Sequence, residues 1–162
     1  MNNKPLVSII MNCYNGEKYL KLALKSVIKQ KYKNWELIFW DNKSTDKSKK
    51  IFKSFKNKRF RYFCAKKFTS LYAARNLAIL CSKGQFISFL DVDDLWMPNK
   101  LNLQIPLFKN KNVGVVYSKL LILNQYKNIK KIHINEKLPD GNISKTIISN
   151  YNIGIITTII RK

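Results

Sequence analysis

The chain has 162 residues, 46% of them hydrophobic, and carries 31 Lys and Arg against nine Asp and Glu for a formal net charge of +22. This apolar content excludes a disordered chain despite the charge, and the length favours one domain with its own core. The basic residues are nearly all lysines, which indicates a solvated surface more than an arginine-rich surface that reads nucleic acid.

Three cysteines are odd in number and form no C-x-x-C pair: Cys13, Cys64 and Cys81. They predict neither a disulfide framework nor a zinc site, which fits a reducing compartment. The first apolar run is too short for a signal-peptide core, and no run approaches the roughly 18 apolar residues of a membrane span. We therefore expect a cytoplasmic protein whose contact with the inner face of an anionic membrane, if it makes one, is peripheral.

The first half of the chain alternates strand and helix patterns. Short apolar runs predict buried strands at residues 6–11, 35–40, 60–64 and 86–90. Apolar residues at helical spacing predict helices at 17–31, up to about Phe55, and at 71–81. For the second helix we expect Ser44 or Thr45 as the cap and Asp46 in the first turn. Gly84 is expected to end the third helix as a left-handed stop.

This alternation predicts an α/β fold with a mostly parallel sheet, right-handed crossovers and helices on both faces. In such open sheets, ligands bind outside the carboxyl ends of the strands. Polar side chains follow three of the predicted strands, and we expect them to meet at that edge. They are Asn12, Tyr14 and Asn15, then Asp41 and Asn42, then Asp91, Asp93 and Asp94.

The later part of the chain has weaker patterns. Pro98 marks a helix start, and Pro106 limits how regular that helix can be. The expected elements are a helix at 100–108, a long strand at 113–123, its hairpin partner at 126–135, a turn at 139–142, a short helix at 143–151 and a last strand at 155–160.

The three carboxylates after the strand at 86–90 carry the strongest chemical signal. They are a third of the chain's nine acidic residues, and within four positions they would repel one another unless a cation lay among them. Carboxylates suit Mg²⁺ or Mn²⁺, because substrate phosphates and waters can complete the octahedron around the ion. We interpret the stretch 85–96 as a divalent-metal site.

The sequence lacks the motifs that other common chemistries require. The chain has no G-x-x-x-x-G-K-[ST] loop and no G-x-G-x-x-G, so neither a P-loop nor a dinucleotide-binding fold is supported. His133 is the sole histidine, lies in a weakly patterned region and is best interpreted as a surface residue. The chemistry expected here is that of carboxylates and a metal.

Five segments, in this order, resemble the successive signatures of family 2 glycosyltransferases with the GT-A fold. They are VSII with YN and YL within 7–20, QKYKNWELI at 30–38, DNKSTD at 41–46, ARNLA at 74–78 and KGQFISFLDVDD at 83–94. The similarity is dense over residues 5–110 and thin beyond. It implies one domain over 1–162, with a donor-binding part at about 5–110 and a partial acceptor region at about 111–162.

The resemblance implies inverting transfer of a sugar from a nucleotide-diphosphate donor, most readily a UDP-sugar, in cell-surface polysaccharide biosynthesis. Asp91-Val92-Asp93 matches the D-x-D motif, with Asp93 as the direct metal ligand and Asp91 near the ribose or the metal. Asn12 and Tyr14 would line the nucleobase and ribose pocket. The alternative for Tyr14 is a packing aromatic.

The remaining donor residues are assigned in the same way. Asn42 stands where the family often has an aspartate that reads uracil, and an amide can both donate and accept there. Arg75 of the A-R-N segment is suited to a diphosphate, the alternative being a tether from the helix to a loop. Asn15 and Asp41 complete the binding edge, whereas Asp46 is better explained as a helix-start residue than as a ligand.

Inverting transfer also needs a general base. In this family it lies in an acidic pair after the strand that 155–160 matches, and Glu136 and Asp140 are the only later acids here. We therefore expect a donor-binding domain without its usual base, acting with a glycan or lipid-linked acceptor. The alternatives are a nucleotide-sugar-binding remnant that no longer transfers and, less favoured, a basic nucleic-acid-binding module.

Overall fold

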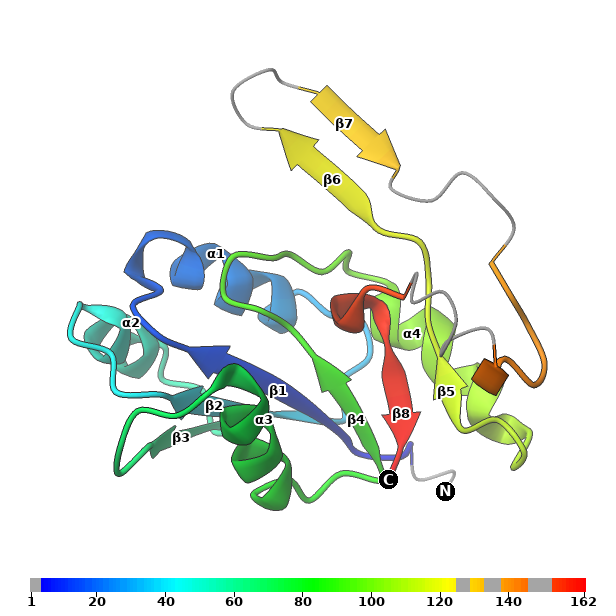
Figure 1. Cartoon of the computed structure of the whole chain (residues 1–162), viewed down its shortest axis with the longest axis horizontal. Coiled ribbons are helices and arrows are strands. Elements are labelled where there is room, and N and C mark those ends of the chain that lie inside the picture. Colours follow the sequence, from blue (N-terminus) through cyan, green and yellow to red (C-terminus); the bar gives the residue numbers. More distant parts are fainter. Residues whose placement is uncertain (1–3, 125–128, 133–137, 146–152) are drawn as a thin grey trace.

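Four apolar segments of the first half form the parallel strands of a six-stranded sheet in the order β3-β2-β1-β4-β8-β5 (Figure 1). The computed structural model describes residues 4–124, 129–132, 138–145 and 153–162. The parallel strands are β1 (Val7–Cys13), β2 (Trp35–Asp41), β3 (Phe60–Cys64) and β4 (Phe86–Phe89). The short strand β8 (Ile159–Arg161) runs antiparallel between β4 and β5 (Val115–Val116). The predicted α/β class and mostly parallel sheet are confirmed.

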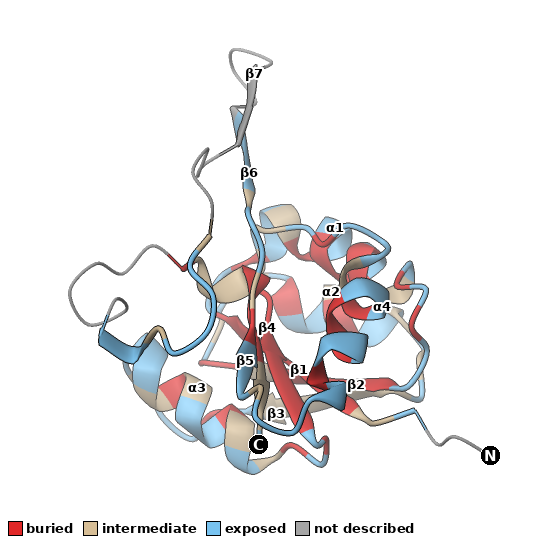
Figure 2. Cartoon of the chain, turned by 90° about the vertical axis from the view of Figure 1, so that its right-hand side faces the viewer, coloured by how far each residue is buried: buried red, intermediate tan, exposed pale blue. Residues whose placement is uncertain are grey.

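Helices cover both faces because side chains alternate along each strand. Ile9, Met11 and Phe39 pack with the helices of one face, while Ile10 and Ile38 pack on the other. The first face holds α1 (Glu17–Ile28), α2 (Ser48–Ser54), α4 (Lys100–Gln104) and the 3-10 helix η1 (Ile105–Lys109). The second face holds α3 (Leu71–Leu80). The buried residues accordingly concentrate in the sheet and on the inner sides of the helices (Figure 2).

The strand order places a switch point beside β1. From β1 the chain adds β2 and then β3 in one direction, and α3 carries it back so that β4 pairs with the other side of β1. Ligands of open α/β sheets bind at the carboxyl ends of the strands that flank such a point. The fold therefore directs attention to the crevice where β1 and β4 end.

Gly84 is required for space, and its prediction as a left-handed stop is wrong. Its φ is not positive, and α3 ends in right-handed backbone at Cys81. A Cβ at Gly84 would lie 2.6 Å from the Ser8 nitrogen and 2.8 Å from the Leu6 oxygen. The Gly84 N–H donates to Ser8 Oγ at 2.8 Å, so the loop passes directly against β1.

Two strand predictions in the later part are wrong in extent. Residues 113–123 do not form one strand, because β5 has only the three residues of β8 to pair with. Residues 155–160 begin with a 3-10 turn, η2 (Ile155–Thr157), before β8. The hydroxyls of Thr157 and Thr158 donate to the carbonyls of Gly154 and Ile155, both at 2.7 Å, which stabilises a turn in place of a strand.

The hairpin prediction is confirmed where the chain is described. Strands β6 (Leu121–Asn124) and β7 (Ile129–Ile132) pair antiparallel as a separate two-stranded sheet that projects from the body (Figure 1). The predicted irregularity at Pro106 is also confirmed, since α4 passes into η1 there. His133, Glu136 and most of the predicted helix at 143–151 lie outside the described residues.

Candidate functional site

Two loops at the carboxyl edge of the sheet are tied together by Asn15. This residue takes a positive φ of 53°, its Oδ1 accepts from the Thr45 N–H at 2.8 Å, and its own N–H donates to Ser44 Oγ at 3.0 Å. Asn15 thus joins the loop after β1 to the loop after β2. Its side chain stabilises the edge, and its side-chain oxygen Oδ1 already accepts a hydrogen bond within the protein.

Asp46 precedes α2, contrary to the expected place in the first turn. The helix begins at Ser48 after Lys47, and Ser44 and Thr45 bond to Asn15 in place of capping it. Asp46 Oδ1 accepts from the Ser48 N–H and Oδ2 from the Glu17 N–H, both at 2.9 Å. Asp46 therefore satisfies the first N–H groups of two helices, which agrees with a helix-start role and not with a ligand role.

Asp41 and Asn42 are both buried, with hydrogen bonds inside the protein. Asp41 Oδ1 accepts from the Ser44 N–H at 2.8 Å, and Oδ2 accepts from the Tyr62 hydroxyl at 2.6 Å. Burial, followed by the Asp41 carboxylate, raises the pKa of Tyr62, so the phenol stays a donor. Asn42 Nδ2 donates to the Thr69 carbonyl at 2.8 Å, and Oδ1 accepts from the Thr69 N–H and hydroxyl. Asn42 thereby fixes the loop that leads into α3.

Asn12 presents a donor without an acceptor. The residue is 8% exposed, and its Nδ2 has no hydrogen-bond partner among the described residues. The Nε1 of Trp40, its register partner on β2, is likewise buried and unpaired. Two adjacent unsatisfied donors are costly, and a ligand acceptor would relieve that cost.

Tyr14 follows β1 with 53% of its surface exposed, and the centroid of its ring lies 4.7 Å from that of Phe68.

Arg75 and Asp91 form an ion pair across the crevice. Arg75 Nη2 donates to Asp91 Oδ1 at 2.8 Å and to Oδ2 at 3.1 Å; the Arg75 side chain is 12% exposed and that of Asp91 33%. The pair ties the first helical turns of α3 to the chain just after β4. Of the two interpretations of Arg75, the tether from helix to loop matches this geometry.

Asp93 and Asp94 are the carboxylates left free at the edge. In the described part of the chain neither side chain has a hydrogen-bond or ion-pair partner, and Asp93 is exposed. Burial, then the charges of Asp93 and Asp91, raise the pKa of Asp94 to about 6. The described residues contain no group of three or more His, Cys, Asp and Glu side chains arranged around one point. The carboxylates of Asp93 and Asp94 lie close to each other and to Asp91, so their negative charges repel. They nevertheless fit a Mg²⁺ or Mn²⁺ ion whose other ligands are phosphate oxygens and waters.

Comparison with known proteins decides the family. The model of glycosyl transferase family 2 matches residues 8–160. The chain belongs to glycosyltransferase family 2. It is 34% identical over 155 residues to the Escherichia coli UDP-Glc:alpha-D-GlcNAc-diphosphoundecaprenol beta-1,3-glucosyltransferase WfgD, covering 96% of this chain and 60% of WfgD. The chain thus spans about 60% of the length of this relative.

Solved structures confirm the GT-A fold expected for family 2. Staphylococcus aureus TarS 1–349 has a TM-score of 0.79 at 24% identity, covering 96% of this chain and 46% of that one, and TarS has also been solved with UDP-GlcNAc. The Pyrobaculum calidifontis mannosyltransferase PcManGT, in complex with GDP-Man and Mn²⁺, has a TM-score of 0.67 at 20% identity, covering 78% of this chain and 39% of that one.

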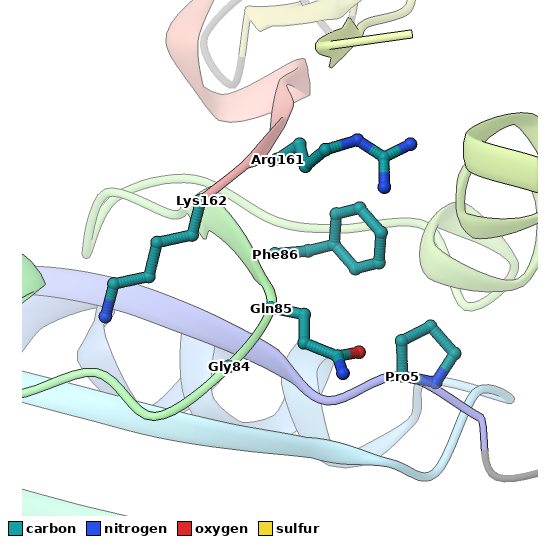
Figure 3. A pocket seen from close by; sticks show the side chains of 6 residues that line it. All are labelled: Pro5, Gly84, Gln85, Phe86, Arg161 and Lys162. Carbon is teal, nitrogen blue, oxygen red and sulfur yellow. The ribbon is translucent and has the colours of Figure 1, made fainter. Parts of the chain in front are cut away.

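One hollow among the described residues adjoins the edge of this family 2 chain that carries the aspartates, and another lies away from it. A cleft of about 520 Å³ between α3 and the segment before β8 is lined by Tyr72, Arg75, Asn76, Ile79, Phe89, Ile153, Gly154 and Ile155. The other hollow, of about 590 Å³, lies where the parallel strands begin (Figure 3). Its cations serve the fold, since Arg161 donates to carbonyls of Phe108, Asn110 and Val113, and Lys162 donates to Ser82.

Beyond Asp94, the one carboxylate among the described residues is Asp140, and its Oδ1 accepts from the next N–H, that of Gly141, at 2.8 Å.

Three residues that contribute to the edge were not predicted from the sequence: Tyr62 within β3, and Phe68 and Thr69 after it. Strand β3 also ends at this edge, so the polar and aromatic run that follows it was the available signal.

Proposed function

We propose that the chain is the donor-binding part of a metal-dependent glycosyltransferase that takes a sugar from a nucleoside-diphosphate donor. The observation that carries this proposal is the pair of carboxylates Asp93 and Asp94, which have no partner among the described residues and lie at the switch-point edge beside the Arg75–Asp91 ion pair. The names of similar proteins support it: WfgD uses UDP-Glc, TarS was solved with UDP-GlcNAc, and PcManGT with GDP-Man and Mn²⁺. A UDP-sugar is the favoured donor because WfgD is the relative with higher identity.

The residues take distinct roles in this proposal. Asp93, with Asp94 beside it, would hold the Mg²⁺ or Mn²⁺ ion, which when bound neutralises charge on the departing diphosphate. The unpaired Nδ2 of Asn12 would donate to the nucleoside, and the exposed ring of Tyr14 would stack on the base. Asn42 and Asp41 would shape the pocket from behind, because their acceptor oxygens already bond within the protein. Asn15 would act in the same indirect way.

The acceptor would enter the cleft beside α3. That cleft shares Arg75 with the ion pair and adds apolar side chains such as Ile79 and Phe89. A glycan or lipid-linked acceptor suits it, in keeping with the diphosphoundecaprenol acceptor in the name of WfgD. We place the general base outside the described residues, and inversion at the anomeric carbon follows from the family resemblance. With such an acceptor, the chain would act in cell-surface polysaccharide biosynthesis.

Titration calorimetry with UDP, with and without Mn²⁺, tests donor binding directly. We expect heat of binding that requires Mn²⁺, because the carboxylates alone would repel the diphosphate. A transfer assay with UDP-Glc then separates the two functional alternatives. Binding without turnover would support the non-catalytic remnant. An affinity for UDP that is independent of Mn²⁺ and falls steeply with salt concentration would support a general polyanion site.

A double-mutant cycle tests whether Arg75 acts through Asp91. We expect Arg75→Gln to weaken Mn²⁺-dependent UDP binding about tenfold and to have little further effect in an Asp91→Asn background, because residues that act as one unit are not additive. Calorimetry on the four proteins measures this. Additive losses would instead show that Arg75 contacts the diphosphate itself.

A further inference from the structure

The loop after β3 and the first turn of α3 expose several large apolar side chains together. Residues 66–72, named here the β3–α3 tip, contain Phe68 at 59%, Leu71 at 48% and Tyr72 at 76% exposure. Lys66 and Lys67 directly precede them and are also exposed. Contiguous apolar side chains of this size mark a surface that meets a partner.

Along the chain, the stretch that contains the tip carries charge of a single sign. In the sequence no Asp or Glu stands between Asp46 and Asp91, whereas Lys and Arg recur throughout that stretch. Lysines beside exposed aromatic and aliphatic side chains complement an anionic lipid surface, where the ammonium groups meet phosphates and the rings enter the headgroup layer.

The tip is fixed in place and adjoins the candidate site. Thr69 makes three hydrogen bonds with Asn42, and the ring of Phe68 rests on Tyr14. Ser70 Oγ caps α3 by accepting from the Ala73 N–H at 3.3 Å. Tyr72 belongs both to the tip and to the lining of the cleft beside α3. A surface bound by the tip would therefore lie against the mouth of that cleft.

We propose that the β3–α3 tip docks on an anionic lipid bilayer, with Phe68, Leu71 and Tyr72 in the headgroup layer and Lys66 and Lys67 on lipid phosphates. The purpose of this contact rests on the proposed function, since it would hold the cleft at the surface where a lipid-linked acceptor lies. The described residues contain no helix that is long and apolar enough to cross a bilayer, and the docking proposed here needs none.

A second basic surface supplies the matched control. The outer face of α1 carries the exposed lysines Lys18, Lys21 and Lys25, Lys29 follows directly after the helix, and Leu22 is the exposed large apolar residue of this face. It lies on the opposite face of the sheet from α3. If charge alone drew the chain to lipid, lysines of α1 and of the tip would count equally.

Vesicle flotation of the whole chain tests the proposal. The probes are vesicles of equal parts phosphatidylglycerol and phosphatidylcholine, and vesicles of phosphatidylcholine alone. We expect binding to the first, lowered about tenfold by Leu71→Ser with Tyr72→Ser and about fivefold per residue by Lys66→Gln and Lys67→Gln. Lys21→Gln with Lys25→Gln should change binding less than about twofold.

Three results would overturn docking by the tip: no preference for the anionic vesicles, no effect of the Leu71 and Tyr72 substitutions, or an equal loss from the α1 pair. Thermal melts confirm that the variants fold, which is expected because all six side chains are exposed. UDP titration of the Lys66→Gln, Lys67→Gln variant without vesicles keeps the two proposals apart. A wild-type chain that floats but binds no UDP would refute the proposed function and leave the docking supported.

Discussion

Asp93→Asn is expected to weaken Mn²⁺-dependent binding of UDP by at least about 100-fold, because it removes the exposed carboxylate best placed to hold the ion. Asp93 has no partner within the described residues, so the substitution breaks no contact there. The loss should therefore appear in calorimetry at an unchanged melting temperature.

Asp140→Asn is the matched control for that experiment. Asp140 is exposed and, among the described residues, accepts from the adjacent Gly141 N–H, which an asparagine oxygen can also do. We expect the control to bind UDP and Mn²⁺ like the wild type. Equal affinities of Asp93→Asn and wild type for UDP in the presence of Mn²⁺ would mean that the ion is held elsewhere, and the assignment of this edge would have to be abandoned.

Glu36→Ala is expected to lower the free energy of unfolding by about 3–5 kcal/mol, a large share of the roughly 5–15 kcal/mol of a typical domain. Glu36 is buried on β2 beneath α3. Its Oε1 accepts from Ser8 Oγ at 2.7 Å and the Lys83 N–H at 2.6 Å, and its Oε2 pairs with Arg61 Nη1 at 2.8 Å. Removal leaves the Ser8 hydroxyl and the Lys83 N–H without this acceptor and takes the carboxylate from Arg61 Nη1, which still donates to the Cys81 carbonyl at 2.7 Å. Chemical denaturation measures the cost. Glu17→Ala, which removes an exposed glutamate that accepts from one N–H, should cost about 1 kcal/mol or less.

The same network sets a pH dependence. Burial opposes ionisation of Glu36, but the bonds from Ser8, Lys83 and Arg61 outweigh it and hold the pKa below its ordinary value of 4.5. A lowered pKa stabilises the fold above pH 4.5, and this stability is lost as the pH falls below that value and through the folded-state pKa. In Glu36→Gln the acid-induced loss of stability should be smaller. An identical acid dependence in Glu36→Gln and wild type would contradict the assignment.

Local sequence patterns predicted the first half of the fold well because its elements are long and regular. The helix at 17–31 shows apolar residues at helical spacing and forms α1, and the run 60–64 forms β3 with the same bounds. The strand prediction at 155–160 was wrong in extent because the hydroxyls of Thr157 and Thr158 bond back to the chain and outweigh the strand propensity. The prediction of one long strand at 113–123 was wrong because the length of β5 depends on β8, a partner strand far away in the sequence.

The sequence by itself determined the fold class, the order of strands and helices in the first half, and the edge at which the polar residues gather, since each follows from local periodicity and the geometry of parallel sheets. Only the tertiary structure decided how those residues divide their work. It showed that Arg75 pairs with Asp91, that Asp41 and Asn42 bond inward, and that Asp93 and Asp94 have no side-chain partner in the part of the chain that the structure describes. These pairings join residues from different elements, and no local pattern contains the distances on which they depend.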